Sequence, residues 1–262
     1  MTLYLDQVLT GWECPPGELR ARLVTGRDDA ELLQLRVDLG LMQMFPDGRP
    51  DGQRYRGFPN AYEYIEHERR LGGHALEAED WDELERELLQ TNYRRMAFAT
   101  VAEDALRANE QTAARRLLRR AVADVETCLE DLRLLRAQPD KADGNTALLP
   151  TLLFDRARLA AQLRISEGAF EEAIERAEQG VAELDAMLGE LGYDEAQRAE
   201  DPGLVYLRKL SAQLRQEYGI ARTLSEQLRE AIDNEDFETA AELREELRRR
   251  QNRRPARDSA GE

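Results

Sequence analysis

Residues 224–250 read LSEQLREAIDNEDFETAAELREELRRR, and this stretch indicates the fold more clearly than any other part of the chain. It contains two helical patterns that meet at the polar turn Asn234-Glu235-Asp236. Residues at three- and four-residue steps mark one helical stripe on each side of the turn: Leu224, Leu228, Ala231 and Ile232 before it, and Phe237, Ala240, Ala241, Arg244 and Leu247 after it. The stretch therefore predicts a helical hairpin, and a hairpin of this size presents a docking face without catalytic chemistry.

The order L-x-x-A-I-x-x-E-D-F-x-x-A-A-x-L-R-x-x-L resembles the UVR motif. This short helical hairpin is shared by the UvrB and UvrC proteins of nucleotide excision repair, and it occurs in ClpC-type unfoldases and in McsA-type activators of protein arginine kinases. The residues that carry the resemblance are Leu228, Ala231, Ile232, Glu235, Asp236, Phe237, Ala240, Ala241, Leu243, Arg244 and Leu247.

The resemblance implies a protein-docking role, because UVR hairpins mediate self-association and UvrB–UvrC pairing. It places the docking face at Leu228, Ile232, Phe237, Ala240, Ala241, Leu243 and Leu247, with a polar rim at Glu235, Asp236 and Arg244. From the residue types, we expect Phe237 to fill the turn, and Ala240 and Ala241 to let the two helices approach closely. Asp236 stands where a helix N-terminus favours a negative charge.

The formal net charge of the 262 residues is −16, so the chain as a whole repels phosphate backbones. Nucleic-acid binding is therefore unexpected, and the basic tail 248–257 is its single candidate. The sequence has no long apolar run and no basic signal-peptide start, which predicts a cytoplasmic protein without a membrane contact. The two cysteines stand far apart in sequence and predict neither a disulfide nor a cysteine-based metal site.

Residues 1–72 form a predicted N-terminal module. Leucine and valine alternate with other residues from Leu33 to Leu41, which indicates one half-buried strand, and residues 19–24 form its expected partner in a β-hairpin. A tandem turn motif, PDG-R-PDG, follows. Its charged residues Asp47, Arg49, Asp51 and Arg54 suggest two alternatives: a recognition loop for a peptide or small polar ligand, or a rigid connector whose charges face water.

Residues 76–220 predict an array of helical hairpins, followed by the UVR-like hairpin at 221–252 and a disordered tail at 253–262. Helical runs are expected from about 79 to 109, up to 137, and over 148–165, 169–191 and 202–233. When the turns at Asn109, Gly168 and Glu235 are aligned, small residues recur at the helix crossings. The segment 166–174 resembles the tetratricopeptide family, so the fold class is mainly α with a tetratricopeptide-like array.

The sequence contains no phosphate-binding P-loop, no H-E-x-x-H zinc signature and no G-x-S-x-G nucleophile elbow. We therefore expect no enzyme, no cofactor and no metal site. The leading hypothesis is a non-catalytic adaptor that docks a partner protein, either a UvrB/UvrC-like protein or a second copy of itself. Three alternatives are an accessory factor of nucleotide excision repair, a regulator of a protease or arginine-kinase system, and an unrecognised enzyme centred on the PDG-R-PDG loop.

Overall fold

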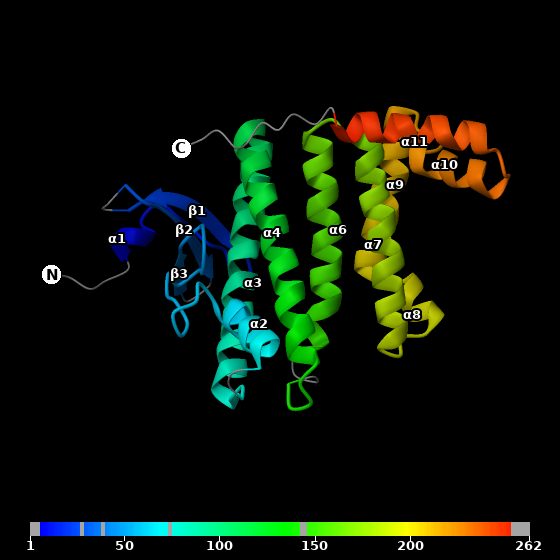
Figure 1. Ribbon diagram of the computed structural model, residues 1–262. Helices are drawn as coiled ribbons and strands as arrows, with labels where there is room; N and C mark the ends of the chain where they lie inside the picture. Colours follow the sequence, from blue (N-terminus) through cyan, green and yellow to red (C-terminus); the bar gives the residue numbers. More distant parts are fainter. Residues whose placement is uncertain (1–5, 27–28, 38–39, 73–74, 142–145, 253–262) are drawn as a thin grey trace.

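The computed structural model describes residues 6–26, 29–37, 40–72, 75–141 and 146–252, and it confirms a mainly α fold with a small N-terminal sheet (Figure 1). The longer helices are α2 (Ala61–Leu71), α3 (Ala78–Arg107), α4 (Gln111–Arg136), α6 (Leu149–Ser166), α7 (Phe170–Glu190), α9 (Pro202–Tyr218), α10 (Leu224–Asp233) and α11 (Phe237–Asn252). The short helical segments are α1 (Asp6–Leu9), η1 (Thr146–Leu148) and α8 (Glu195–Ala199).

The central helices stand side by side, and each packs on the next in the order α3, α4, α6, α7, α9 (Figure 1). The sheet covers one side of this row at α3, and the hairpin of α10 and α11 lies across the ends of α7 and α9 at the other side (Figure 1). Close approach within the row depends on small residues. A Cβ atom at Gly180 of α7 would collide with the side chain of Ala157 on α6. None of the described helices is long and apolar enough to cross a membrane.

The N-terminal sheet has three strands, β1 (Arg20–Thr25), β2 (Glu31–Val37) and β3 (Gly40–Met44), in the order β1-β2-β3 and antiparallel throughout. The predicted pairing of β1 with the next strand is confirmed. The prediction of one strand from Leu33 to Leu41 is wrong, because Val37 pairs with Gly40 and Leu33 pairs with Met44. The core-facing positions shift by one across the reversal, since Leu33 and Leu35 of β2 pair with Met44 and Met42 of β3. Leu41 pairs with Arg36 on the other face of the sheet, so its apolar side chain continues the alternation in the sequence alone. The predicted strand residue Leu39 lies outside the described residues.

The sheet and the helical row share one core. Leu33 and Leu35 of β2 are fully buried in the same apolar cluster as Phe98 of α3 and Leu118 of α4. This packing explains how so small a sheet is stable, since an isolated hairpin is marginal in water. The division into units at 1–72, 76–220 and 221–252 stays a prediction, and the predicted disordered tail 253–262 lies outside the described residues.

Several helix ends follow the capping signals of the sequence. The Asn60 side chain accepts a hydrogen bond from the Glu63 backbone N–H at 2.7 Å, and Gly72 ends α2 with a left-handed φ of 63°. Asp201 caps α9 in the same way, directly before Pro202. The predicted single run over 202–233 is wrong, because Gly219 adopts a φ of 65° and ends α9 before α10 begins.

The three aligned turns have the same backbone geometry. Asn109, Gly168 and Glu235 adopt left-handed φ values of 60°, 74° and 58°. In each turn the next residue donates its backbone N–H to a carbonyl five residues earlier: Glu110 to Ala105 at 2.8 Å, Ala169 to Arg164 at 2.9 Å, and Asp236 to Ala231 at 2.8 Å. This pattern is a Schellman-type helix end. The turn at Gly219 ends in the same way, with the Ile220 N–H donating to Arg215 at 3.0 Å, so the internal repeat stays a prediction.

Candidate partner-binding site

The hairpin of α10 and α11 is built from locally capped helices. Thr223 begins α10 with a capping box, in which its hydroxyl accepts from the Glu226 N–H at 3.2 Å and the Glu226 carboxylate accepts from the Thr223 N–H at 2.6 Å. After the turn, the Asp236 carboxylate accepts from the Thr239 backbone N–H at 3.1 Å. Hydrogen bonds from the Thr239 hydroxyl and N–H lower the pKa of Asp236. The Asp236 carboxylate is thus engaged in starting α11.

The base of the hairpin is attached to the helical row through charged groups. Arg215 of α9 donates to Glu226 of α10 at 2.7 Å and to Glu178 of α7 at 2.8 Å. The Leu224 backbone N–H donates to Glu171 of α7 at 3.3 Å, and Thr223 is fully buried at this junction. The turn at the other end of the hairpin points away from the row (Figure 1). The hairpin is therefore held at its base, and its tip projects from the body.

The predicted docking residues fall into three environments. Ala240 is buried, and Leu228, Leu243 and Leu247 are half-buried. The others are exposed: Ile232, Glu235, Asp236, Phe237, Ala241 and Arg244. The side chain of Phe237 is 70% exposed and that of Ile232 is 42% exposed, and these two residues flank the turn. An apolar tip (Ile232, Phe237 and Ala241) therefore faces outward beside the polar turn.

Two expectations about this hairpin are wrong. Phe237 does not fill the turn, because its ring points out from α11 and stays accessible. Ala241 does not lie at the helix crossing, since it is exposed. The close approach of α10 and α11 instead uses Ala240 and Ala231, which are 5% and 7% exposed. One position of α11 therefore packs on α10, and its neighbour along the sequence faces outward.

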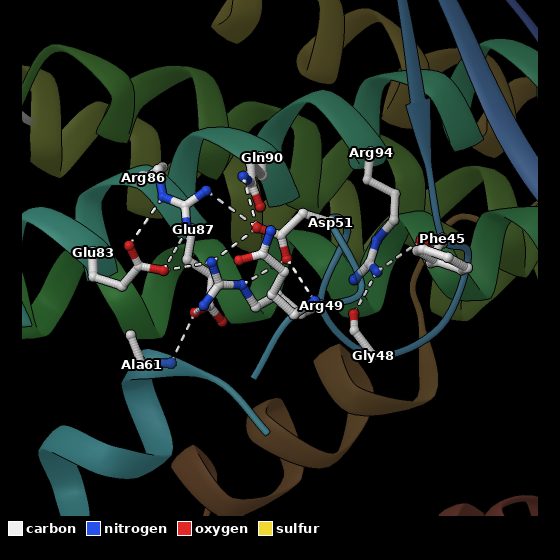
Figure 2. Close-up of polar contacts among 11 residues, drawn as sticks. Phe45, Gly48, Arg49, Asp51, Ala61, Glu83, Arg86, Glu87, Gln90 and Arg94 are labelled. Carbon is white, nitrogen blue, oxygen red and sulfur yellow. Dashed lines mark hydrogen bonds and ion pairs between the residues drawn. The ribbon is translucent and has the colours of Figure 1, made fainter. Parts of the chain in front are cut away.

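The PDG-R-PDG loop binds the body of the protein through Arg49 (Figure 2). The side chain of Arg49 is 1% exposed, and it pairs with Asp51 of the loop at 2.8 Å. It also pairs with Glu83 of α3 and lies 3.9 Å from Glu87 of the same helix. Asp51 accepts further hydrogen bonds from Arg86 and Gln90 of α3, both at 3.2 Å. The connector interpretation, in which these charges face water, is wrong for Arg49.

A second arginine holds the same loop from the α3 side (Figure 2). Arg94 donates to the backbone carbonyls of Phe45 at 3.2 Å and Gly48 at 2.5 Å, and it pairs with Asp124 of α4 at 2.7 Å. The remaining predicted loop residues lie nearer the surface. Asp47 pairs with Arg120 of α4 at 3.1 Å, and Arg54 donates to the Gly57 carbonyl at 2.7 Å. Loop and helices thus form one polar network, and ligand recognition by the loop stays a prediction.

α4 contains a buried carboxyl group, that of Asp131, which belongs to no recognisable sequence motif. Asp131 is fully buried, and no donor in the described part of the chain reaches either of its carboxyl oxygens. Burial, and then the charges of Glu87 and Glu130, raise its pKa well above the ordinary value. Its neighbour in the core, Cys128, is also fully buried, and burial raises the pKa of that thiol. An acidic residue within an amphipathic helical pattern predicts a solvent-exposed side chain. The sequence therefore does not predict the burial of Asp131.

Comparison with known proteins bears on the hairpin alone. Residues 220–253 match the UvrB/uvrC motif, UVR. The UVR motif is a protein- and DNA-interaction module found in UvrB/UvrC-type proteins, and the matched residues of this chain form α10 and α11, named here the UVR hairpin. Neither a curated protein nor a solved structure matches the chain. The tetratricopeptide resemblance of the helical row therefore stays a prediction.

Proposed function

We propose that this protein is a non-catalytic adaptor that holds a partner protein through the tip of its UVR hairpin. The observation that carries the proposal is the 70% exposure of Phe237 on a hairpin that is attached at its base. Exposure of a large apolar ring to water is unfavourable, and aromatic residues supply much of the binding energy in protein interfaces. The outward orientation of Phe237 is what a docking module requires.

The expected partner surface is a helix pair or an apolar groove. Full burial of an exposed apolar side chain contributes about 1.5–3 kcal/mol, and the accessible parts of Phe237 and Ile232 would contribute a corresponding fraction each. The charged residues beside them, Glu235 and Arg244, would form a polar rim that orients the partner. So small an apolar centre supports a reversible contact, in keeping with an adaptor.

Quantitative co-purification from the native cell tests the proposal. Full-length wild-type chain, Phe237→Ala and Leu71→Ala serve as baits. Leu71 is a matched control, because it is 69% exposed and lies at the end of α2, outside the UVR hairpin. We expect a protein that is recovered by wild type and by Leu71→Ala and is depleted at least tenfold with Phe237→Ala. Equal recovery by all three baits would contradict the proposal.

A UvrB- or UvrC-type protein is the more specific candidate partner, and the match of residues 220–253 to the UVR motif supports it. In this case the chain would serve as an accessory factor of nucleotide excision repair. Mixing the full chain with purified UvrB and with purified UvrC in sedimentation experiments tests this possibility. A complex that Phe237→Ala weakens supports the candidate, and two independently sedimenting proteins reject it while leaving the adaptor proposal intact.

The proposal includes no reaction and no contact with nucleic acid. Buried charged groups that could suggest an active site bind one another between helices: Arg94 pairs with Asp124, and Arg95 pairs with Asp155. The net charge of −16 opposes binding to phosphate backbones. Purified chain is therefore expected to leave a labelled DNA duplex unbound even at low salt. Salt-dependent binding that disappears on replacing Arg253, Arg254 and Arg257 with Gln would contradict this part of the proposal.

A further inference from the structure

A cleft of about 510 Å³ lies at the base of the UVR hairpin, away from its tip. It is bounded by the turn between α6 and α7, the first two turns of α7, the end of α9, and the sides of α10 and α11. Phe170, Tyr218 and Ile220 supply the apolar part of its lining, and Leu247 of α11 closes one side. This cleft connects the hairpin to the helical row.

The lining combines an aromatic surface with carboxylates. The rings of Phe170 and Tyr218 are stacked with centroids 3.5 Å apart, and Tyr218 remains 40% exposed. Glu171, Glu172 and Glu175 line the same cleft and are half-buried. Among the described residues that line the cleft, Arg176 is the one cation, and it is exposed. The lining therefore carries an excess of negative charge.

This combination fits a guanidinium group. Arginine is planar, stacks on aromatic rings and donates two parallel hydrogen bonds to a carboxylate, so an aromatic and acidic cleft suits it better than lysine. Glu171 already accepts the Leu224 N–H, and Glu172 lies 3.4 Å from Arg164. A carboxylate has about four acceptor sites, so a carboxylate that already has partners can also accept from a guanidinium group.

The chain itself supplies a suitable occupant next to the cleft. Leu247 lines the cleft, α11 continues to Asn252, and Arg253, Arg254 and Arg257 follow directly. Asn252 is about 8 Å further along the helix than Leu247, and the five residues 253–257 span up to about 17 Å when extended. The tail is therefore long enough to return to the cleft. We propose that residues 253–257 bind the cleft between α7 and the UVR hairpin.

Tethering makes this contact effective even if its intrinsic affinity is low. A segment joined by a short linker has an effective concentration in the millimolar range. The bound tail would bridge α7 and α11 and hold the hairpin against the row. Any basic segment of another protein would have to displace the tail before it could enter. The inference does not depend on the proposed function, because it concerns the base of the hairpin and leaves the tip free.

Peptide binding to the full-length chain tests the inference. The probe is a fluorescein-labelled peptide of residues 249–258, titrated with wild type and with a neutral-tail variant, Arg253→Gln/Arg254→Gln/Arg257→Gln, at low salt. Because the tail of wild type occupies the cleft, we expect the neutral-tail variant to bind the peptide at least tenfold more tightly. Adding Glu172→Gln/Glu175→Gln to the neutral-tail variant should abolish this binding.

Glu190→Gln/Glu195→Gln provides the matched control, since it removes the same charge from the opposite end of α7 and from α8. In the neutral-tail variant this control should retain the peptide affinity. Equal affinity of wild type and neutral-tail chain would overturn the inference, because the tail would then not occupy the site. It would also be overturned by an absence of binding, or by equal losses in the cleft variant and its control.

Discussion

Phe237 and Ala240 lie three residues apart on α11, yet their side chains are 70% and 5% exposed. The contrast shows that α11 packs on α10 through a small residue and turns its aromatic residue outward. An isolated pair of short helices is marginal in water, so the close contact at Ala240 is what stabilises the hairpin. The exposed ring can then serve an interface without destabilising the fold.

Enlarging Ala240 should therefore disrupt the hairpin. Ala240→Leu forces extra methyl groups between α10 and α11, which costs about 1–3 kcal/mol. Amide hydrogen exchange should become faster in both helices and stay unchanged in α3 and α4. Ala241→Leu is the matched control, because Ala241 is exposed and the larger side chain meets solvent. Equal protection of the hairpin in both variants would show that the helix crossing lies elsewhere.

Acid should loosen the base of the hairpin. The hydrogen bond from Arg215, partly opposed by burial, lowers the pKa of Glu226 below its ordinary value of 4.5. A depressed carboxyl pKa contributes stability that is fully present above the unfolded-state pKa and is lost as the pH falls through the folded-state pKa. Hydrogen exchange in α10, corrected for its intrinsic pH dependence, should therefore accelerate below about pH 4.5 relative to α3.

Glu226→Gln separates this ion pair from general acid effects. The amide can still accept the Thr223 N–H, but it no longer attracts Arg215 as a carboxylate does. This variant should show faster exchange in α10 at neutral pH and no further loss of protection specific to α10 on acidification. If wild type and Glu226→Gln lose protection in parallel, the ion pair does not hold the hairpin base.

Replacing Asp131 with Asn should stabilise the protein at pH 7. Burial is the first cause of the raised pKa of Asp131, followed by the charges of Glu87 and Glu130. The folded state therefore binds a proton more tightly than the unfolded state, and wild-type stability falls as the pH rises between the two pKa values. Asp131→Asn removes this linked cost, so it should raise the free energy of unfolding that urea denaturation measures at pH 7.

Glu130→Gln is the control for this prediction, because Glu130 is exposed on the same helix and its replacement removes the same charge. Its free energy of unfolding should stay within about 0.5 kcal/mol of wild type. The gain of Asp131→Asn should shrink as the pH is lowered toward 4, because the unfolded wild-type chain then begins to bind the same proton as the folded state. A gain that does not depend on pH would have a cause other than the carboxylate.

Arg49 should be a major stabilising residue of the N-terminal half. Arg49→Met removes the cation that lies among Asp51, Glu83 and Glu87 and leaves their charges unpaired. Removing one partner of a buried ion pair costs about 3–5 kcal/mol. Arg54→Met, an exposed change in the same loop, should cost less than about 0.5 kcal/mol. Urea unfolding measures both, and similar small losses would show that the loop does not depend on Arg49.

The sequence predicts helix ends well where a single residue determines the backbone conformation. Asn60, Gly72 and Asp201 mark helix ends because capping depends on the residue itself and its near neighbours. The split of β2 from β3 is not predictable in this way. The buried positions shift from Leu33 and Leu35 to their partners Met44 and Met42, but Leu41, which pairs with Arg36 on the other face, is apolar as well. The alternation in the sequence therefore conceals the reversal.

In the candidate site, too, the sequence predicts the local features, whereas the burial of side chains depends on how the helices pack. The UVR pattern locates the hairpin, and the Asp236 cap and the turn at Glu235 follow from it. The packing of α10 against α11 determines that Ala240 is buried and Ala241 is exposed. The exposure of Phe237 follows from the same packing. The burial of Arg49 likewise depends on contacts with α3, which begins some 30 residues later.

Photo-crosslinking at the hairpin tip tests the central claim most directly. A benzophenone amino acid replaces Phe237 in one full-length chain and the equally exposed Leu71 in another, and each is irradiated in the native cell. Docking through the tip predicts a discrete protein adduct from position 237 that is absent from position 71. The same adducts from both positions, or none from position 237, would contradict a partner-binding role for the UVR hairpin.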